Sequence, residues 1–319
     1  MWQPDRSVRG PLRATRDDVD DLNRVFAESF TDRYRKDGLG GVRVPLLNAA
    51  IWHYAIADAG EGAMLWRDSR DAIVAFNMVH LAGTEGWMGP LAVRTDRQGT
   101  GLGQEVVRAG VEWLRSQGAR TIGLETMPRT MDNIGFYSTI GFVPGRLTIT
   151  LTLEAATVDR PTPLLGKLTS GARDDALAAC RHLTESQLPG YDFSREILLT
   201  LELGLGDVAL LHARGELAGF ALFHSAPLVE GRSREELRVL KLVLRRESDV
   251  DDMAELLSDA SRRVGTRRVA TRVQGEYVET YRRLIKRGAR VRWTDLRMAV
   301  AGNEERRAAT GVVLSNWEI

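Results

Sequence analysis

The feature that most constrains the fold of this 319-residue chain is a recurrence of strand and helix patterns between its two halves. The apolar stretch FNMVH ends at His80, and a similar stretch, FALFH, ends at His224, 144 residues later. GARTIGLET begins at Gly118, and GTRRVATRV begins 147 residues later at Gly265. A period of about 150 residues is too long for a solenoid repeat. The recurrence predicts two homologous α/β domains, residues 1–155 and 156–319, in agreement with the size at which single cores stop growing.

The pattern of the first half alternates between strands and helices. Thr15 and Asp18 form a potential capping box, and a helix with one apolar stripe follows them. Residues 31–60 are expected to be irregular, with an apolar-aromatic patch from Ala49 to Tyr54. Strands are predicted at 12–14, 63–67, 73–80, 87–93, 121–125 and 146–154, with helices from 102 to Gly118 and over 131–140.

Residues 155–163 are predicted to be a linker, because Pro161 and Pro163 interrupt regular pairing. The same order of elements then returns. Strands are predicted at 207–212, 217–224, 237–244, 267–273 and 290–300, and helices at 172–187, 250–263 and 276–287.

Composition excludes several classes of function. The chain has 44 basic and 43 acidic residues and a net charge of +1, which argues against a nucleic-acid-binding surface. No apolar run approaches the roughly 20 residues of a membrane span, and the first residues lack the apolar core of a secretory signal. Cys180 is the only cysteine, so no intramolecular disulfide or cysteine metal cluster can form. We therefore expect a cytoplasmic protein without a metal.

The segment with the clearest chemistry is the glycine-rich loop Gln98-Gly-Thr-Gly-Leu-Gly103, which lies between a predicted strand and a predicted helix. Small residues let a ligand approach the backbone, and the free N–H groups at a helix start attract an anion such as a pyrophosphate. The spacing differs from the G-x-G-x-x-G dinucleotide pattern, and no Gly-Lys-Ser/Thr follows. Taken alone, the loop fits equally well a glycine turn needed only for tight packing of the helix on the strand.

Residues 91–142 resemble the GCN5-related N-acetyltransferase (GNAT) superfamily. The loop of residues 98–103 matches the acyl-CoA motif Gln/Arg-x-x-Gly-x-Gly/Ala, and Phe136-Tyr137 stands before Gly141-Phe142, where the family has a tyrosine before a Gly-Phe pair. The resemblance implies two tandem GNAT domains of the α/β (α+β) class, each a mixed central β-sheet flanked by helices. It also implies acetyl-CoA as co-substrate.

The resemblance also implies roles for individual residues. Leu91, Ala92 and Val93 would pair with the pantetheine arm, and the N–H of Val93 would stabilise the thioester oxygen. Asn133 would touch the cofactor, although it is four residues before the tyrosine and the family position is about seven before. Tyr137 would protonate the leaving thiolate, the alternative being a packing role for its ring. The implied cofactor-binding residues are Leu91, Ala92, Val93, Gln98, Gly99, Thr100, Gly101, Leu102, Gly103 and Asn133.

The general base is less well defined. Many relatives carry a glutamate in the strand that is predicted here at 87–93, but this strand has no carboxylate. Glu125, inside the strand 121–125, and Glu85, just before the strand 87–93, are the candidates, and a water relay is the alternative. His80 has a counterpart in His224, which favours a structural role.

The second half lacks the features that bind acetyl-CoA. The connection from strand to strand has 26 residues in the first half (94–119) and 22 in the second (245–266). The loop at the start of the second connection contains three aspartates, a glutamate and no glycine, so it would repel a pyrophosphate. Leu284 stands opposite Tyr137. We therefore predict that 1–155 is the active acetyltransferase domain and that 156–319 is a degenerate one.

The last residues, Gly311 to Ile319, are unusually apolar for a chain end. One interpretation is a closing strand of the second sheet. Another places this segment beside the first active site, where Glu318 or the Ile319 carboxylate would act as base.

Together these observations predict acetyl transfer from acetyl-CoA to a primary amine of a small molecule, directly in a ternary complex, by a monomer or homodimer. The alternatives are a non-catalytic acyl-CoA sensor or interaction protein and an O-acyltransferase. No nucleic acid or membrane partner is expected.

Overall fold

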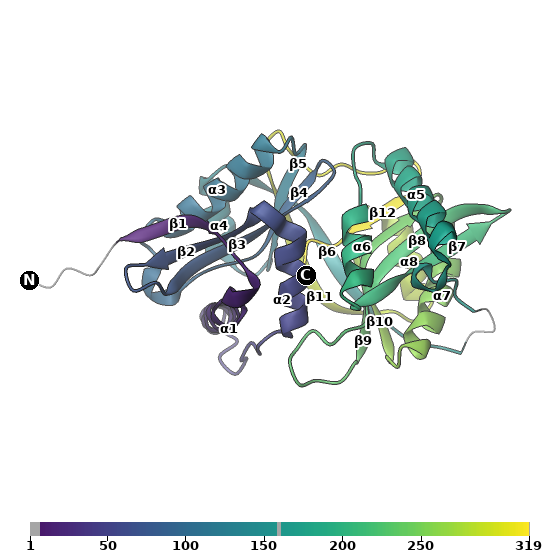
Figure 1. Ribbon diagram of the computed structural model, residues 1–319, viewed down its shortest axis with the longest axis horizontal. Coiled ribbons are helices and arrows are strands. Elements are labelled where there is room, and N and C mark those ends of the chain that lie inside the picture. Colours follow the sequence, from purple (N-terminus) through teal and green to yellow (C-terminus); the bar gives the residue numbers. More distant parts are fainter. Residues whose placement is uncertain (1–6, 158–160, 319) are drawn as a thin grey trace, which may run out of the picture.

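The structure is a computed structural model that describes residues 7–157 and 161–318 (Figure 1). The first half of the chain contains β1 (Val8–Arg13), α1 (Val19–Lys36), α2 (Ala49–Ala59), β2 (Ala63–Asp68), β3 (Ile73–Ala82), β4 (Glu85–Val93), α3 (Leu102–Ser116), β5 (Thr121–Thr126), α4 (Met131–Thr139) and β6 (Phe142–Glu154). Part of the predicted linker, residues 158–160, lies outside the described residues.

The second half repeats much of this order. It contains α5 (Ser170–Gln187), α6 (Ser194–Glu202), β7 (Gly206–Ala213), β8 (Glu216–His224), β9 (Glu236–Leu244), α7 (Val250–Arg263), β10 (Arg268–Gln274), α8 (Val278–Lys286), β11 (Arg290–Val300) and β12 (Val312–Ser315). The predicted fold class is therefore confirmed: it is a mixed α/β structure with helices flanking a central sheet.

Within the described residues, the strands form one twelve-stranded sheet that runs through both halves. The order is β1-β2-β3-β4-β5-β11-β6-β10-β9-β8-β7, and β12 pairs with β9 off this path. The strands of the two halves alternate at the centre of the sheet. Strand β11 of the second half lies between β5 and β6 of the first, and β6 of the first half lies between β11 and β10 of the second. The centre of the molecule is therefore a continuous antiparallel sheet, although the halves are separate in sequence.

Two helices differ from the sequence expectation. The region 31–60 was expected to be irregular, but α1 continues to Lys36 and the aromatic patch forms α2, whose first turn is capped by Asn48 (Oδ1 accepts from Ala50 N at 3.0 Å). Helix α2 is buried around most of its circumference, so its sequence shows no amphipathic stripe. Helix α6 was not anticipated. The capping box is confirmed in the 3-10 turn Arg16–Asp18 that leads into α1, since Asp18 Oδ2 accepts from Thr15 N at 2.7 Å.

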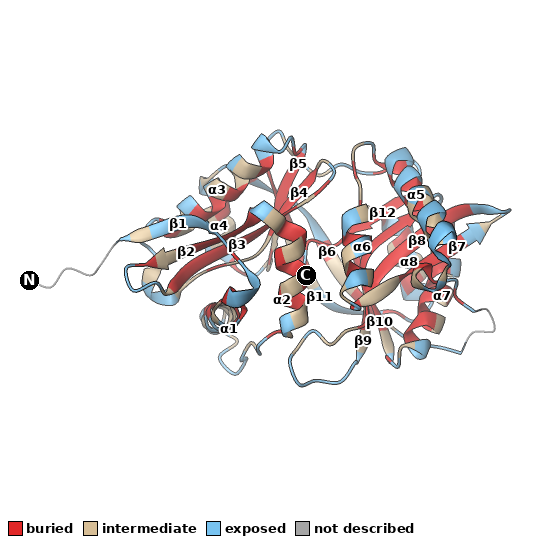
Figure 2. Ribbon diagram, viewed as in Figure 1, coloured by how far each residue is buried: buried red, intermediate tan, exposed pale blue. Residues whose placement is uncertain are grey.

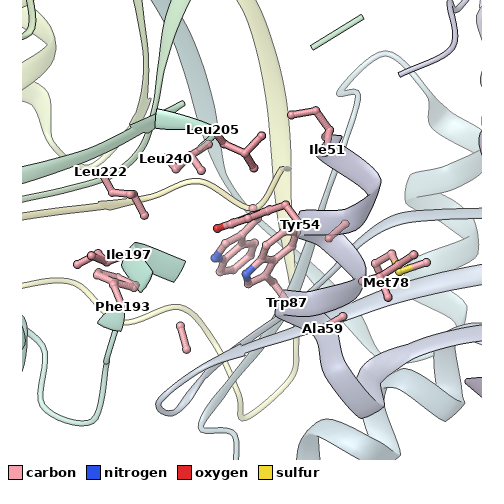
Figure 3. Packing of buried hydrophobic residues seen from close by; sticks show 14 of the residues in the cluster. Ile51, Tyr54, Ala59, Met78, Trp87, Phe193, Ile197, Leu205, Leu222 and Leu240 are labelled. Atoms are coloured by element: carbon pink, nitrogen blue, oxygen red, sulfur yellow. The ribbon is translucent and has the colours of Figure 1, made fainter. Parts of the chain in front are cut away.

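Three hydrophobic clusters of buried residues stabilise the fold. Figure 2 shows that much of the central sheet is buried. Helices α3 and α4 pack on one face of the first half of the sheet, and α7 packs with α8 on the corresponding face of the second half. The largest cluster is shared between the halves and lies between α2 and α6. Figure 3 shows Tyr54 and Trp87 of the first half beside Phe193 and Ile197 of the second. This shared core fixes the two halves against each other.

Candidate active site

The candidate site begins where β4 and β5 stop pairing. These parallel strands are in register from Glu85↔Thr121 to Met88↔Leu124 and no further. At the next position, Gly89 and Pro90 of β4 lie opposite the single residue Met78 of β3, so β4 carries one extra residue and forms a bulge. Beyond the bulge, residues 91–93 pair with β3 but with no other strand in the described chain. One edge of β4 is therefore open to an added partner.

The backbone of β4 presents its polar groups to this edge. The Val93 carbonyl accepts from Ser29 Oγ at 3.3 Å and from Gln98 Nε2 at 3.1 Å, and the next amide, Arg94 N, donates to Val74 of β3 at 2.8 Å. In a strand, the N–H and C=O of one residue point to the same side, and those of the next residue point to the opposite side. Since Arg94 N–H points toward β3, the N–H groups of Val93 and Leu91 point away from it. Of the three predicted pantetheine-binding residues, Leu91 and Val93 thus have backbone groups on the open edge, whereas the backbone of Ala92 faces its partner Phe76 of β3.

The glycine-rich loop connects this strand to α3. Gly99 and Gly101 have φ angles of +73° and +92°, which glycine adopts without strain, and a Cβ at either position would meet no atom within 4 Å. The α3 N-cap is Gly101 itself, which has no side chain to satisfy the first amides. In the described structure, no hydrogen bond engages the N–H groups of residues 99–103. Free backbone N–H groups at a helix start are an arrangement that can bind an anion such as a phosphate.

Polar contacts fix the loop and add positive charge to it. Gln98 bridges β4 and α1, since its Nε2 donates to Val93 and its Oε1 accepts from Lys36 Nζ at 3.0 Å. Thr100 Oγ1 donates to the Arg97 carbonyl at 2.7 Å, which tightens the turn. At the third glycine, a Cβ would lie 3.3 Å from the Phe136 ring, so Gly103 allows α3 to approach α4 closely.

Tyr137 of α4 is 7% exposed and belongs to the cluster that contains Leu102, with Leu91 and Val93 packed against it. Its ring contacts Phe136 and Phe142. Burial raises the pKa of the Tyr137 phenol well above its usual value, so the hydroxyl stays protonated at neutral pH. A protonated hydroxyl is what a general acid needs.

Asn133 lies in the first turn of α4, and its Nδ2 donates to Thr126 Oγ1 at the end of β5, at 3.4 Å. It therefore lies beside the end of β5.

Glu125 is held in an ion-pair network at the end of β5. Its carboxylate accepts from Thr148 Oγ1 at 2.7 Å, from Arg297 Nε at 2.9 Å and from Arg272. Burial would raise the pKa of Glu125, but the charges of Arg272 and Arg297 outweigh it and hold the pKa below its usual value. Glu125 is thus an ionised carboxylate whose oxygens are both occupied.

Glu85 lies at the other end of β4 and is completely buried. Its two oxygens accept from Ser315 Oγ at 2.7 Å and Trp317 Nε1 at 2.9 Å, and Lys241 Nζ is 3.9 Å away. Glu85 therefore ties the last segment of the chain to the first half.

The last residues also reach the β4 bulge. The carbonyl oxygen of Trp317 lies 3.6 Å from the position that a Cβ on Gly89 would take, and the indole packs on Gly123 of β5. The Arg297 guanidinium lies 4.0 Å from the indole centre. Strand β12 pairs with β9, so the closing-strand interpretation is confirmed, and the segment beyond it contacts β4 and β5. Ile319 lies outside the described residues.

The structure adds two groups that the sequence did not identify as partners. Asp295 of β11 joins Glu125 and Glu318 in a carboxylate cluster, with one oxygen of each within 4.8 Å of the others. Burial and the charge of Glu318 raise the pKa of Asp295 to about 7. His80 contacts Asp58 Oδ2 at 2.5 Å and the Gly89 carbonyl at 3.1 Å, so it supports the bulge.

The corresponding region of the second half is filled. Strands β9 and β10 pair only from Arg268↔Glu236 to Ala270↔Arg238, but β12 then pairs with β9 from Lys241 to Leu244. The start of α7 is acidic: Asp249 is its N-cap, and Asp251 and Asp252 lie in its first turn. No glycine occupies this loop, and Leu284, at the tyrosine position, lines a small apolar cavity.

Residues 24–142 match the acetyltransferase (GNAT) family. Curated protein sequences give no match. Three solved structures share the fold at low identity. A putative acetyltransferase from Pyrococcus horikoshii is 17% identical, with a TM-score of 0.67, over 99% of this chain and 96% of that one. A GCN5-related N-acetyltransferase from Sphaerobacter thermophilus is 18% identical, with a TM-score of 0.59, over 93% and 96%. A tandem GNAT protein from the clavulanic acid biosynthesis pathway is 16% identical, with a TM-score of 0.57, over 92% and 99%.

Among the described helices, none combines the length and apolar character needed to cross a membrane.

The comparisons with known proteins agree with the geometry of the first half. The family match covers the strand opening, the glycine-rich loop and Tyr137, and the fold likeness extends over both halves. Residues 24–142 thus match the acetyltransferase (GNAT) family, and over both halves the chain shares the fold of solved GNAT proteins.

Proposed function

We propose that the first half transfers the acetyl group of acetyl-CoA to a primary amine of a small molecule, in a ternary complex. The observation that carries this proposal is the combination of an open β4 edge with an uncapped glycine-rich loop at its end. A strand edge is suited to the amides of a pantetheine arm, and the loop is suited to a pyrophosphate. Acetyl-CoA contains both groups at the two ends of one extended chain.

The residues around this opening supply the functions that thioester aminolysis requires. Leu91 and Val93 orient the pantetheine arm, and the N–H of Val93 is placed to stabilise the developing oxyanion. Tyr137 holds a proton for the departing thiolate, and its raised pKa keeps that proton in place at neutral pH. When bound, acetyl-CoA supplies an acetyl group that is activated for attack by a neutral amine.

The two carboxylates that the sequence suggests as bases have different positions. Glu125 lies one residue beyond Leu124, the last β5 residue that pairs with β4, whereas Glu85 lies at the far end of β4. The lowered pKa of Glu125 and its contacts to Arg272 and Arg297 make it a weak proton acceptor. We therefore propose that Glu125 organises the carboxylate cluster and that Glu85 anchors the last segment.

Only the first half is proposed to bind acetyl-CoA. In the second half, β12 takes the strand edge that corresponds to residues 91–93, and acidic residues surround the start of α7. Carboxylates at a helix start occupy the favourable end of the dipole and repel a phosphate. Cytoplasmic location and a monomeric or homodimeric state are part of this proposal, and nucleic acid and membranes are not proposed as partners.

The proposal is tested with acetyl-CoA and the purified chain. Calorimetry is expected to give one acetyl-CoA per chain, and a panel of small amines is expected to include acceptors that release the CoA thiol. Tyr137→Phe should bind acetyl-CoA as tightly as the wild type but release thiol about 100-fold more slowly, as expected for loss of a general acid. Binding without amine-dependent release in the wild type would instead indicate a sensor. Release only with alcohols would indicate O-acyl transfer. Two sites per chain would contradict the assignment to one half.

A further inference from the structure

We propose that Glu318 accepts the proton of the acceptor amine, and that the second half of the chain acts in the reaction by holding Glu318 at the first site. This inference rests on the proposed function and identifies its base. It also assigns a role to the second half, in which β12 occupies the strand edge that corresponds to the open edge of β4.

The segment that carries Glu318 is fixed by the second half. Strand β12 is antiparallel to β9, from Val312↔Leu244 to Ser315↔Lys241, and Asn316 N continues the pairing by donating to Leu240 O at 2.8 Å. The buried Lys241 ammonium donates to Ser315 Oγ at 2.8 Å and to the Asn316 carbonyl at 3.3 Å. These contacts determine the direction in which the chain leaves the second half.

The segment then crosses to the opening in the first half. Trp317 places its indole on Gly123 of β5, donates Nε1 to Glu85 and brings its carbonyl oxygen next to Gly89 of the β4 bulge. Glu318 is the next residue, so its backbone starts beside the point where β4 and β5 separate. In the related fold of the second half, β12 itself fills the equivalent opening.

Exposure distinguishes Glu318 from the other carboxylates of the cluster. The Glu318 side chain is 50% exposed, whereas the side chains of Glu125 and Asp295 are 4% and 6% exposed. A base must reach the substrate nitrogen, directly or through one water. Within the cluster, only Glu318 combines proximity to the bulge with access from solvent.

The surrounding charges hold Glu318 in place and provide a route for its proton. Arg272 Nη1 lies 2.7 Å from Glu318 Oε2, and its Nη2 donates to Asp295 Oδ2 at 3.0 Å. Asp295, with its pKa raised to about 7 by burial and the Glu318 charge, is suited to share the proton. The charged groups that face Glu318 are Arg272, Arg238, Glu125 and Asp295.

The proposed step is balanced in atoms and electrons. The lone pair of the neutral amine forms the C–N bond with the thioester carbon, and the amine proton passes to the Glu318 carboxylate. The C–S bond breaks, its electron pair leaves on sulfur, and the sulfur takes the Tyr137 proton. Glu318 then releases its proton to solvent while Tyr137 regains one, so the net products are the acetylated amine and the CoA thiol.

The position of Glu318 is tested without knowledge of the acceptor. Glu318→Cys is treated with bromoacetyl-CoA, whose electrophilic carbon replaces the acetyl methyl group. Cys180 is 1% exposed and is replaced by alanine in all samples. We expect saturable alkylation of Glu318→Cys that acetyl-CoA suppresses. The control, Glu304→Cys, lies on the exposed loop before β12 and should react slowly and without protection.

Unprotected or absent alkylation of Glu318→Cys, in a protein that binds acetyl-CoA, would overturn the inference but leave the proposed function intact. Failure of the wild type to bind acetyl-CoA would instead refute the proposed function, and with it the inference.

The catalytic role is tested with the amines that the wild type accepts. Glu318→Gln is expected to slow thiol release by about 100-fold, with unchanged acetyl-CoA affinity and loss of the acid limb of the pH–rate profile. Glu318→Asp should retain that limb, and Glu304→Gln should match the wild type. A Glu318→Gln variant with a lower melting temperature but a normal rate and pH profile would show that the residue is only structural.

Discussion

The glycine-rich loop gives a prediction in which stability and cofactor affinity respond differently. Gly101→Asp places a carboxylate at the start of α3, where the second half carries Asp249. Because a Cβ at Gly101 meets no atom within 4 Å, the only structural cost is the φ of +92°. That conformation costs an L-residue about 1–2 kcal/mol, and loss of glycine entropy in the unfolded chain offsets about 0.4–1 kcal/mol. The free energy of unfolding should therefore fall by only about 1 kcal/mol.

The effect on acetyl-CoA binding should be larger. Two unit charges about 5 Å apart repel by about 0.8 kcal/mol in water and by about 3 kcal/mol near a protein surface. The repulsion between the new carboxylate and the two negative charges of a pyrophosphate thus amounts to about 2–6 kcal/mol in total. A loss of 1.4 kcal/mol in binding free energy raises Kd about tenfold. We expect at least a tenfold loss of affinity, measured by calorimetry, with a melting curve close to that of the wild type.

The matched control is Gly118→Asp, at the other end of the same helix. Gly118 has a φ of +79°, and a Cβ there would also meet no atom within 4 Å, so the backbone cost is the same. A carboxylate at this end opposes the helix dipole by about 0.3–1 kcal/mol but lies far from the loop. The reasoning is refuted if Gly101→Asp binds acetyl-CoA as the wild type does, or if both variants lose affinity equally.

Three further predictions concern the last segment of the chain and its anchors. Trp317→Ala removes a 2%-exposed indole and its bond to Glu85, and should lower the free energy of unfolding in urea by about 3 kcal/mol; a change below about 1 kcal/mol would mean that the segment is not docked. Lys241→Met leaves the Glu196 carboxylate, which lies 3.0 Å from the Lys241 ammonium, without its ion-pair partner. The free energy of unfolding should fall by about 3 kcal/mol, and adding Glu196→Leu should restore part of it. No recovery of stability in the double variant would contradict the pairing. Asp295 has a folded-state pKa of about 7 against an ordinary 3.8, so its stabilising contribution is complete below about pH 4 and is lost as pH rises through 7. Asp295→Asn should flatten the fall in melting temperature between pH 5 and pH 8, and an unchanged slope would refute this.

Most elements could be predicted because their patterns are local. The strands over 73–80, 87–93 and 237–244 and the helix over 250–263 are observed within a few residues of their predicted bounds. The prediction was wrong for α2 because its burial in the shared core removes the amphipathic pattern from its sequence. The exchange of β6 and β11 could not be predicted, because each pairs with strands more than 100 residues away and the local pattern does not specify such partners.

The candidate site was partly predictable for the same reason. A glycine-rich loop between a strand and a helix is a local signal, and the structure places it beside an open strand edge. Glu125 was identified from its strand, but its partners Arg272 and Arg297 come from strands more than 140 residues away. The apolar chain end indicated a docked segment, and its contact with Gly89 follows only from the three-dimensional path.

The sequence by itself determined the recurring pattern of strands and helices, the glycine-rich loop at residues 98–103 and the absence of such a loop in the second half. These are short-range properties of glycine placement, charge and hydrophobic period. The tertiary structure decided how the halves share one sheet, which strand edge is open and which is filled by β12, and which carboxylate reaches the opening. Those outcomes depend on pairing between segments that are distant in the chain, where the burial of strand edges and charges, and not local preference, selects the arrangement.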